Sequence, residues 1–254
     1  CLVEAMRGQV MRLGIVLLMC LSGAAMVAHA QGSAKLEVGH FSVAAEGAVL
    51  PDGWAPLTFK KIERHTTYEV VKDGPVSVVK AVSEASASGL TKAVSIDPHE
   101  YPIVRWRWKV ENLLQKGNVN RKDGDDYPAR LYITFAYEPA KVSFGRKLKY
   151  QAGRVLFGDI PIGALNYIWD GKSPVGTVVD NAFTDFAKMI VVESGPQRIG
   201  TWVEEERNVY EDYRLAFGEE PPAISGVAIM SDTDNTEERV VAYYGDIVFV
   251  RALK

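Results

Sequence analysis

Most of the chain from Lys35 onward consists of short runs of β-branched and aromatic residues, separated by glycine, proline, aspartate and asparagine. Runs of this kind, spaced by roughly ten residues, are typical of strands joined by turns. The pattern favours an antiparallel sandwich or barrel. We expect one domain over residues 31–254, an all-β, jelly-roll-like antiparallel β-sandwich. The expected strands are Leu57–Ile62, Thr67–Lys72, Val76–Val82, Leu90–Ile96, Ile103–Val110, Arg130–Tyr137, Met189–Glu193, Trp202–Val209, Ile224–Met230 and Val240–Val250.

Two short helices are expected to interrupt the strands. Residues 143–156 place their apolar side chains on one helical face, with Ser143 in position to cap the N-terminus. The second helix, Tyr210–Phe217, turns its aromatic residues inward and is followed by Gly218, a residue type common after helix ends. Both helices are short additions to a β-structure.

The strand Ile103–Val110 alternates strictly between apolar and cationic residues. Because successive side chains of a strand point to opposite faces, Trp106 and Trp108 are expected in the core and Arg105 and Arg107 on the other face. Solvated arginines are one interpretation of that face. A sheet that exposes two arginines in mid-strand would also suit the floor of a ligand groove.

The first thirty residues resemble an export signal. Arg7 and Arg12 precede an uncharged, mostly apolar run over residues 13–27, and Ala28-His29-Ala30 follows it. This pattern predicts a secretory signal peptide over residues 1–30, cleaved after Ala30, and a periplasmic or secreted protein. Crossing a bilayer takes about 20 apolar residues, so we expect no membrane span after cleavage.

Charge and cysteine content exclude several function classes. The chain has 29 Lys+Arg against 32 Asp+Glu, a net charge of −3, which removes the general electrostatic case for nucleic-acid binding. Both cysteines, Cys1 and Cys20, lie in the expected signal peptide, so thiol chemistry and cysteine metal sites are not expected afterwards. The sequence also lacks a nucleophile elbow, a P-loop, a dinucleotide fingerprint and a zinc-binding helix.

Asp123, Asp125 and Asp126 surround Gly124 just ahead of the expected strand that begins at Arg130. Clustered carboxylates beside a glycine can bind Ca²⁺ through oxygen atoms, and they also serve in plain hairpin turns. Calcium is therefore a possible cofactor, and the turn is the alternative.

A second acidic segment, Ser231–Thr236, follows an apolar strand. It is not an EF-hand loop, because Glu237 and Tyr243 occupy the positions that require glycine and glutamate. Asp232 and Asp234 could act as acid and base in an enzyme, together with Asp126. They could instead pair with the arginines and, with Asn235, orient the hydroxyls of a ligand, or simply close a hairpin.

Seven segments are distinctive when read together: Trp106–Val110, Gly124–Tyr132, Leu165–Trp169, Glu206–Arg214, Phe217–Pro222, Asp232–Thr236 and Tyr244–Ile247. Together they resemble a bacterial exported family that is described as domain of unknown function 3047. The family has no established activity, so the resemblance implies no role for any residue. The closing segment Tyr244–Phe249 is more loosely similar to the last strand of jelly-roll carbohydrate-binding modules.

We expect the exported protein to bind a carbohydrate or another polar ligand of the cell envelope without catalysing a reaction. In this interpretation Trp169 stacks on a sugar ring, although a core position is the alternative. Two rival hypotheses are a glycan-acting hydrolase with paired carboxylates and a structural envelope protein without a ligand. The residues expected to bind the ligand are Arg105, Arg107, Arg130, Trp169, Asp232, Asp234 and Asn235.

Overall fold

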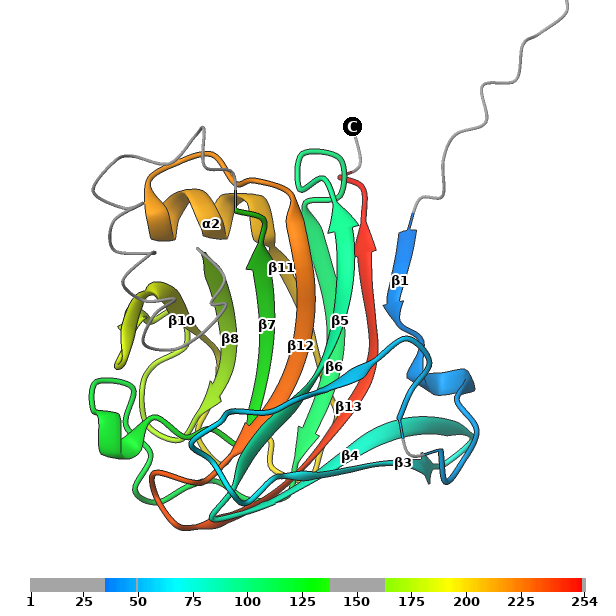
Figure 1. Cartoon of the computed structure of the whole chain (residues 1–254), viewed down its shortest axis with the longest axis vertical. Coiled ribbons are helices and arrows are strands. Elements are labelled where there is room, and N and C mark those ends of the chain that lie inside the picture. Colours follow the sequence, from blue (N-terminus) through cyan, green and yellow to red (C-terminus); the bar gives the residue numbers. More distant parts are fainter. Residues whose placement is uncertain (1–34, 49, 138–162, 253–254) are drawn as a thin grey trace, which may run out of the picture. The chain divides into compact units, whose positions relative to one another are not determined.

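The computed structural model describes residues 35–48, 50–137 and 163–252, which form mainly strands (Figure 1). The expected signal peptide over residues 1–30 and the expected helix over residues 143–156 lie outside the described residues. The strands are β1 (Lys35–Gly39), β2 (Ala55–Leu57), β3 (Thr67–Asp73), β4 (Val76–Glu84), β5 (Ala87–Ile96), β6 (Ile103–Val110), β7 (Ala129–Phe135), β8 (Ala164–Asp170), β9 (Val178–Asn181), β10 (Thr184–Ser194), β11 (Val203–Asn208), β12 (Ile224–Asp232) and β13 (Arg239–Val250). The helical elements are η1 (Phe41–Val43), η2 (Lys122–Gly124) and α2 (Val209–Phe217).

The strands form two sheets that pack face to face. The six-stranded sheet has the order β11-β6-β13-β4-β3, with β1 also paired to β13, and the seven-stranded sheet has the order β2-β5-β12-β7-β8-β10-β9. This confirms the jelly-roll-like β-sandwich, with one correction: β8 and β10 are parallel neighbours, so the seven-stranded sheet is mixed. The chain leaves β8, forms the edge strand β9, and returns as β10 between the two.

Large aromatic side chains fill the space between the sheets. Trp106 and Trp108 of β6 point inward as predicted, with exposed fractions of 4% and 0%. The Trp106 ring stacks on Tyr167 of the opposite sheet at a centroid distance of 5.3 Å, and the Trp108 ring lies 6.2 Å from that of Trp169. Such ring pairs bury a large apolar area and contribute additional geometry-dependent attraction. The core is therefore formed jointly by both sheets.

The structure corrects three local predictions. The segment Leu57–Ile62 is not a strand, since β2 ends at Leu57. Leu165–Asp170 is absent from the expected strands, yet it belongs to the buried strand β8. The turn after Asp232 does not close a hairpin, because β12 and β13 pair in different sheets.

The helix α2 confirms the predicted second helix. The Asn208 side chain caps its N-terminus by accepting a hydrogen bond from the backbone N–H of Glu211 at 3.1 Å. Gly218 ends it with a φ of +71°, a conformation that glycine adopts without a steric cost. Tyr213 packs into the core against Phe135, with ring centroids 4.4 Å apart. Within the described residues, no helix has the length and apolar character that a bilayer crossing requires.

A carboxylate at the margin of the core gives folding a predicted pH dependence. Burial raises the pKa of Glu205 to about 7, against the opposing hydrogen bond from Trp108 Nε1. Because the folded-state pKa lies above the unfolded one, ionisation of Glu205 destabilises the fold as pH rises from about 4.5 to 7. We expect Glu205→Gln to stabilise the protein by about 1–2 kcal/mol at pH 8, after allowance for solvent screening, and to have little effect at pH 4. Urea unfolding at both pH values measures this, and an equal effect at pH 4 and pH 8 would refute the assignment.

Candidate functional site

One end of the seven-stranded sheet gathers several of the polar residues that the sequence singled out. Strands β7 and β12 are antiparallel neighbours with Met230 opposite Arg130, so β7 starts beside the end of β12 (Figure 1). The loop before β7 and the turn after β12 bring further carboxylates to the same place. We call this group the polar cluster; it consists of Asp125, Asp126, Arg130, Asp232, Asp234 and Asn235.

Arg130 is the centre of the polar cluster and is only 2% exposed. Its Nε donates to Asp232 Oδ1 at 2.7 Å and its Nη2 donates to Asp232 Oδ2, which makes the pair bidentate. Nη2 also donates to the backbone carbonyl of Asp125 at 2.5 Å, and Nη1 donates to the Tyr132 hydroxyl at 3.1 Å. The guanidinium carbon lies 4.4 Å from the centroid of the Tyr127 ring. The fork of Arg130 is thus held by planar, charge-assisted contacts on several sides.

Asp126 fixes the turn that follows β12. Its Oδ2 accepts a hydrogen bond from the backbone N–H of Thr236 at 2.6 Å, and its Oδ1 accepts one from Asn235 Nδ2 at 3.0 Å. Asp232 Oδ1 accepts a further bond from the backbone N–H of Tyr127 at 3.2 Å. The two segments are therefore joined reciprocally, because a backbone N–H of each donates to a carboxylate of the other.

Burial disfavours the ionised form of three carboxylates in the polar cluster, those of Asp125, Asp232 and Asp234. Burial raises the pKa of Asp232, and the nearby Asp126 and Asp125 add to this effect while Arg130 opposes it. Burial likewise raises the pKa of Asp125, with Arg130 opposing. Asp234 is half-exposed, and burial together with the charge of Asp126 raises its pKa. The cause is common to all three: carboxylates held close together and away from water disfavour the ionised form.

The structure does not bring the three arginines together as a ligand-binding surface. Arg105 and Arg107 lie on the outer face of the six-stranded sheet, whereas Arg130 lies in the seven-stranded sheet. Arg105 pairs with Glu206 at 2.5 Å, and the Arg107 guanidinium carbon lies 4.5 Å from the centroid of the Trp202 ring. Both arginines point outward as predicted, but away from the polar cluster.

Two further predicted ligand residues are buried. Trp169 is 0% exposed and packs between the sheets, so its ring offers no face to a sugar, and that expectation was wrong. Asp232 is 2% exposed and is bound to Arg130, so it does not face an open groove. The half-exposed members of the predicted set in the polar cluster are Asp234 and Asn235.

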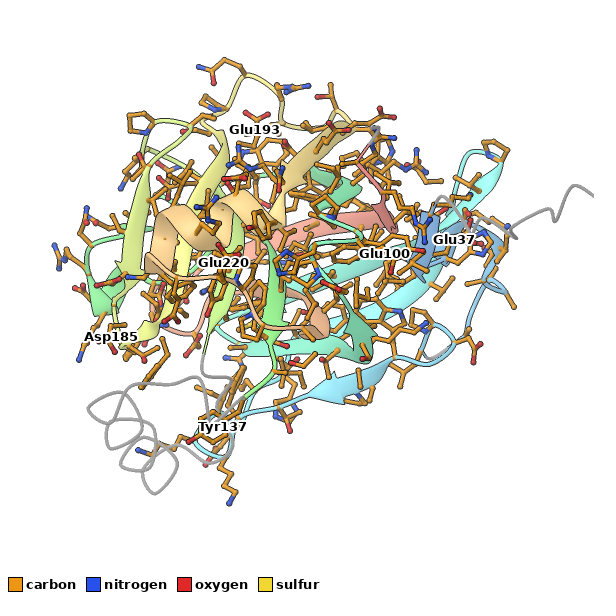
Figure 2. The ribbon with its side chains drawn as sticks, turned by 90° about the horizontal axis from the view of Figure 1, so that it is seen from above. Glu37, Glu100, Tyr137, Asp185, Glu193 and Glu220 are labelled. Carbon is orange, nitrogen blue, oxygen red and sulfur yellow. The ribbon has the colours of Figure 1, made fainter. Side chains whose placement is uncertain are left out.

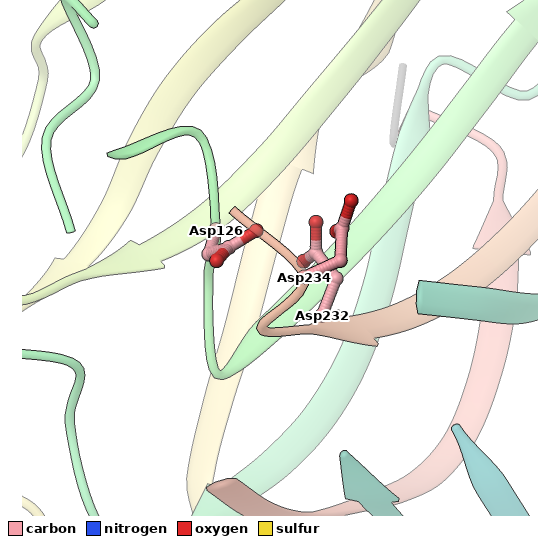
Figure 3. Close-up of side chains that lie close together, drawn as sticks. All are labelled: Asp126, Asp232 and Asp234. Carbon is pink, nitrogen blue, oxygen red and sulfur yellow. The ribbon is translucent and has the colours of Figure 1, made fainter. Parts of the chain in front are cut away.

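The predicted calcium ligands also need a correction. Asp123 is exposed and pairs with Arg121, whereas Asp125 and Asp126 are buried. Among the described residues, the carboxylates that come within 4.8 Å of one another are those of Asp126, Asp232 and Asp234 (Figure 3). A metal-type arrangement therefore joins the two acidic segments, which the sequence analysis treated separately.

A pocket of about 470 Å³ lies at the opposite end of β12. It is bounded by the end of β5, the loop between β5 and β6, and the segment that leads into β12. Glu100, in the loop between β5 and β6, is labelled in Figure 2. We call it the end pocket. Its lining residues are Leu36, Ser95, Ile96, Asp97, His99, Glu100, Tyr101, Pro221, Pro222 and Ala223.

The walls of the end pocket combine apolar and polar groups. Ser95, Asp97, His99 and Glu100 are exposed, while Tyr101 is 7% exposed at the apolar side. Asp97 Oδ1 accepts a hydrogen bond from the backbone N–H of His99 at 2.8 Å, which fixes the loop. The pocket therefore presents hydroxyl, carboxylate and imidazole groups beside an apolar wall.

Further contacts hold the rim of the end pocket in place. The His99 ring packs on that of Tyr210 in α2, with centroids 4.9 Å apart, and Glu100 pairs with Arg251. The Tyr210 hydroxyl in turn donates to Glu220 at 2.6 Å. The rim is thus braced from α2 and from the end of β13.

No motif in the sequence marks the end pocket. His99 stands in an ordinary polar loop, and Pro221-Pro222 is a plain approach to a strand. The two segments are far apart in the sequence and meet because β5 and β12 are antiparallel neighbours, with Ile96 opposite Ile224. Knowledge of this strand pairing would have located the pocket, but the sequence pattern alone does not show which strands pair.

Comparison with solved structures finds weak likenesses that concern the fold alone. The K2 cleaved adhesin domain of Lys-gingipain is 12% identical, with a TM-score of 0.41, and the match covers 87% of this chain and 100% of that one. The family 11 carbohydrate-binding module of the cellulase Lic26A-Cel5E of Clostridium thermocellum is 8% identical, with a TM-score of 0.40 and coverages of 87% and 96%. The family 30 module of Cel9D-Cel44B of the same organism is 10% identical, with a TM-score of 0.41 and coverages of 86% and 99%.

The comparisons at the level of sequence give a family and no activity. No curated protein matches the chain. A family model described as "Protein of unknown function (DUF3047)" matches residues 52–248, a segment that includes the polar cluster and most of the end pocket. The chain therefore belongs to the DUF3047 family.

Proposed function

We propose that this protein binds a carbohydrate, or another polyhydroxylated ligand of the cell envelope, in the end pocket and without catalysis. The observation that carries the proposal is the make-up of the pocket, in which exposed carboxylate, hydroxyl and imidazole groups adjoin an apolar wall. Ligand pockets commonly have volumes of about 300–1,000 Å³, and the end pocket falls within that range.

The chemistry of a sugar matches the two sides of the pocket. The carboxylates of Asp97 and Glu100 accept hydrogen bonds, and sugar hydroxyls donate them. The apolar side of a sugar ring can lie against Leu36 and Pro222, which are half-exposed apolar residues of the lining. Since His99 and Glu100 are braced by Tyr210 and Arg251, less conformational entropy is lost when a ligand orders them.

The polar cluster gives little support to the rival hydrolase. Two of its three candidate catalytic carboxylates, Asp126 and Asp232, are buried and already hydrogen-bonded. A glycosidase needs two carboxyl groups on either side of a scissile bond, about 5–9.5 Å apart, facing an accessible substrate. We propose instead that the polar cluster stabilises the fold. Paired charges have that role in the hypothesis of a structural envelope protein. Cleavage after Ala30 and export remain part of the proposal.

Calorimetric titration tests the proposed function. Chitohexaose, cellohexaose and a peptidoglycan-derived disaccharide are suitable soluble probes, and we expect saturable one-site binding of at least one of them. His99→Ala and Glu100→Gln should each weaken that binding about tenfold, which corresponds to about 1.4 kcal/mol. The matched substitutions His65→Ala and Glu84→Gln change exposed residues outside the pocket and should leave binding unchanged.

Two results would count against the proposal. Absence of saturable binding with every probe would remove it, and undiminished binding by the two pocket variants would place the ligand elsewhere. Release of new reducing ends from a probe would favour the hydrolase hypothesis instead.

A further inference from the structure

Three carboxylates from two separate segments meet at the polar cluster. Asp126 precedes β7, Asp232 ends β12, and Asp234 lies in the following turn (Figure 3). Each offers an oxygen atom, and these atoms lie within 4.8 Å of one another. Oxygen atoms so close together are the ligands that hard divalent cations prefer.

The local charge is far from balanced. Asp125 adds a fourth carboxylate, and its Oδ1 lies 3.8 Å from Arg130 Nη1. The guanidinium of Arg130 contacts the carboxylates of Asp125 and Asp232. The ammonium of Lys116 lies nearby and donates to the backbone carbonyl of Thr236 at 2.8 Å. Several buried or half-buried carboxylates share few cations, and a divalent cation would offset the excess negative charge.

A second observation points to a ligand at the same place. Thr236 is 1% exposed, and its hydroxyl has no hydrogen-bond partner in the structure. Its backbone N–H binds Asp126 Oδ2 at 2.6 Å, and covalent geometry keeps Oγ1 within about 4 Å of that nitrogen. A buried hydroxyl normally finds a partner, so an orphaned one beside a carboxylate group calls for an explanation. A cation bound by Asp126 would supply the missing partner.

The carboxylates keep enough free acceptor sites for a cation. A carboxylate has about four lone-pair sites. Asp232 uses three of them, for Arg130 Nε, Arg130 Nη2 and the Tyr127 N–H, and Asp126 uses two, for Thr236 N–H and Asn235 Nδ2. Asp234 is half-exposed and faces the same group. Each of the three carboxylates can therefore give an oxygen to a metal ion without breaking the bonds described above.

We infer that Asp126, Asp232 and Asp234 bind a single calcium ion, with the Thr236 hydroxyl beside it. Calcium takes about six to eight oxygen ligands in flexible geometry and so accepts an irregular set from two loops, whereas magnesium requires near-ideal octahedral coordination. By tying the turn after β12 to the loop before β7, the ion would stabilise the polar cluster. This inference does not rest on the carbohydrate pocket, which lies at the other end of β12.

Calcium titration of protein stripped with EDTA tests the inference. We expect one calcium ion per chain by calorimetry, weaker binding of magnesium, and a melting temperature that is higher in calcium than in EDTA. Asp234→Asn should weaken calcium binding at least tenfold. The matched variant Asp123→Asn changes an exposed carboxylate that pairs with Arg121, and it should bind calcium as the wild type does.

Thr236→Val provides an independent variant, because it removes a hydroxyl without a hydrogen-bond partner and should not impair folding. It should lower calcium affinity while its melting temperature in EDTA stays at or above that of the wild type. Equal melting temperatures of the wild type in calcium and EDTA would overturn the inference. Wild-type calcium affinity in both Asp234→Asn and Thr236→Val would overturn it as well.

Discussion

Replacing Arg130 by methionine will lower the free energy of unfolding by about 3–5 kcal/mol, because it leaves the buried carboxylate of Asp232 without its partner. Arg105→Met is the matched control. Its side chain is 55% exposed and pairs with Glu206 on the surface, so the loss there should stay within about 1 kcal/mol. Chemical denaturation of the two variants measures the difference directly.

A double-mutant cycle separates the ion pair from other effects of the substitution. Asp232→Asn alone should also be strongly destabilising, whereas adding it to Arg130→Met should cost much less than the sum of the single changes, since both act on one interaction. Additive losses would show that the two side chains contribute independently, and equal losses from Arg130→Met and Arg105→Met would contradict the buried position of Arg130.

The second large effect concerns the core. Trp169→Ala should destabilise the protein by about 3–5 kcal/mol, because the ring is fully buried and its removal leaves a cavity between the sheets. Trp202 is the matched control. It is half-buried on the outer face and packs under Arg107, so Trp202→Ala should cost clearly less.

Thermal and urea unfolding of the two tryptophan variants give the comparison. Carbohydrate affinity provides a second readout, for which Trp169→Phe keeps most of the buried volume. If Trp169→Phe folds normally but loses binding to the oligosaccharide probes, the tryptophan contacts the ligand after all and the core assignment fails.

The alternation of apolar and polar residues predicted those strands that have one solvent-exposed face and one buried face. Ile103–Val110 alternates, and its bounds and its inward-facing tryptophans were predicted correctly. β8 failed this test because all seven of its residues are buried, so no alternation marks it. Strands covered on both faces lose the period-two signal, and only their length and flanking turns identify them.

The candidate site was predictable in composition but not in environment. The two acidic segments and Arg130 were identified from residue type, and the structure does bring them together. What the sequence could not give is that β12 and β13 belong to different sheets. The turn after Asp232 therefore crosses between the sheets instead of closing an exposed hairpin. Asp232 and Arg130 are buried at this crossing, and the end pocket lies at the opposite end of β12.

The most direct test of this division between a buried polar framework and a separate ligand pocket is an NMR titration of backbone amides. On addition of the oligosaccharide that binds in calorimetry, we predict chemical-shift changes concentrated at the amides of residues 95–97, 99–101 and 223, with those of residues 125–127, 129–130 and 232–236 little affected; the prolines in these segments carry no amide proton. Changes concentrated at residues 125–130 and 232–236 instead would contradict the account, because they would place the ligand on the group of charges assigned here to the framework.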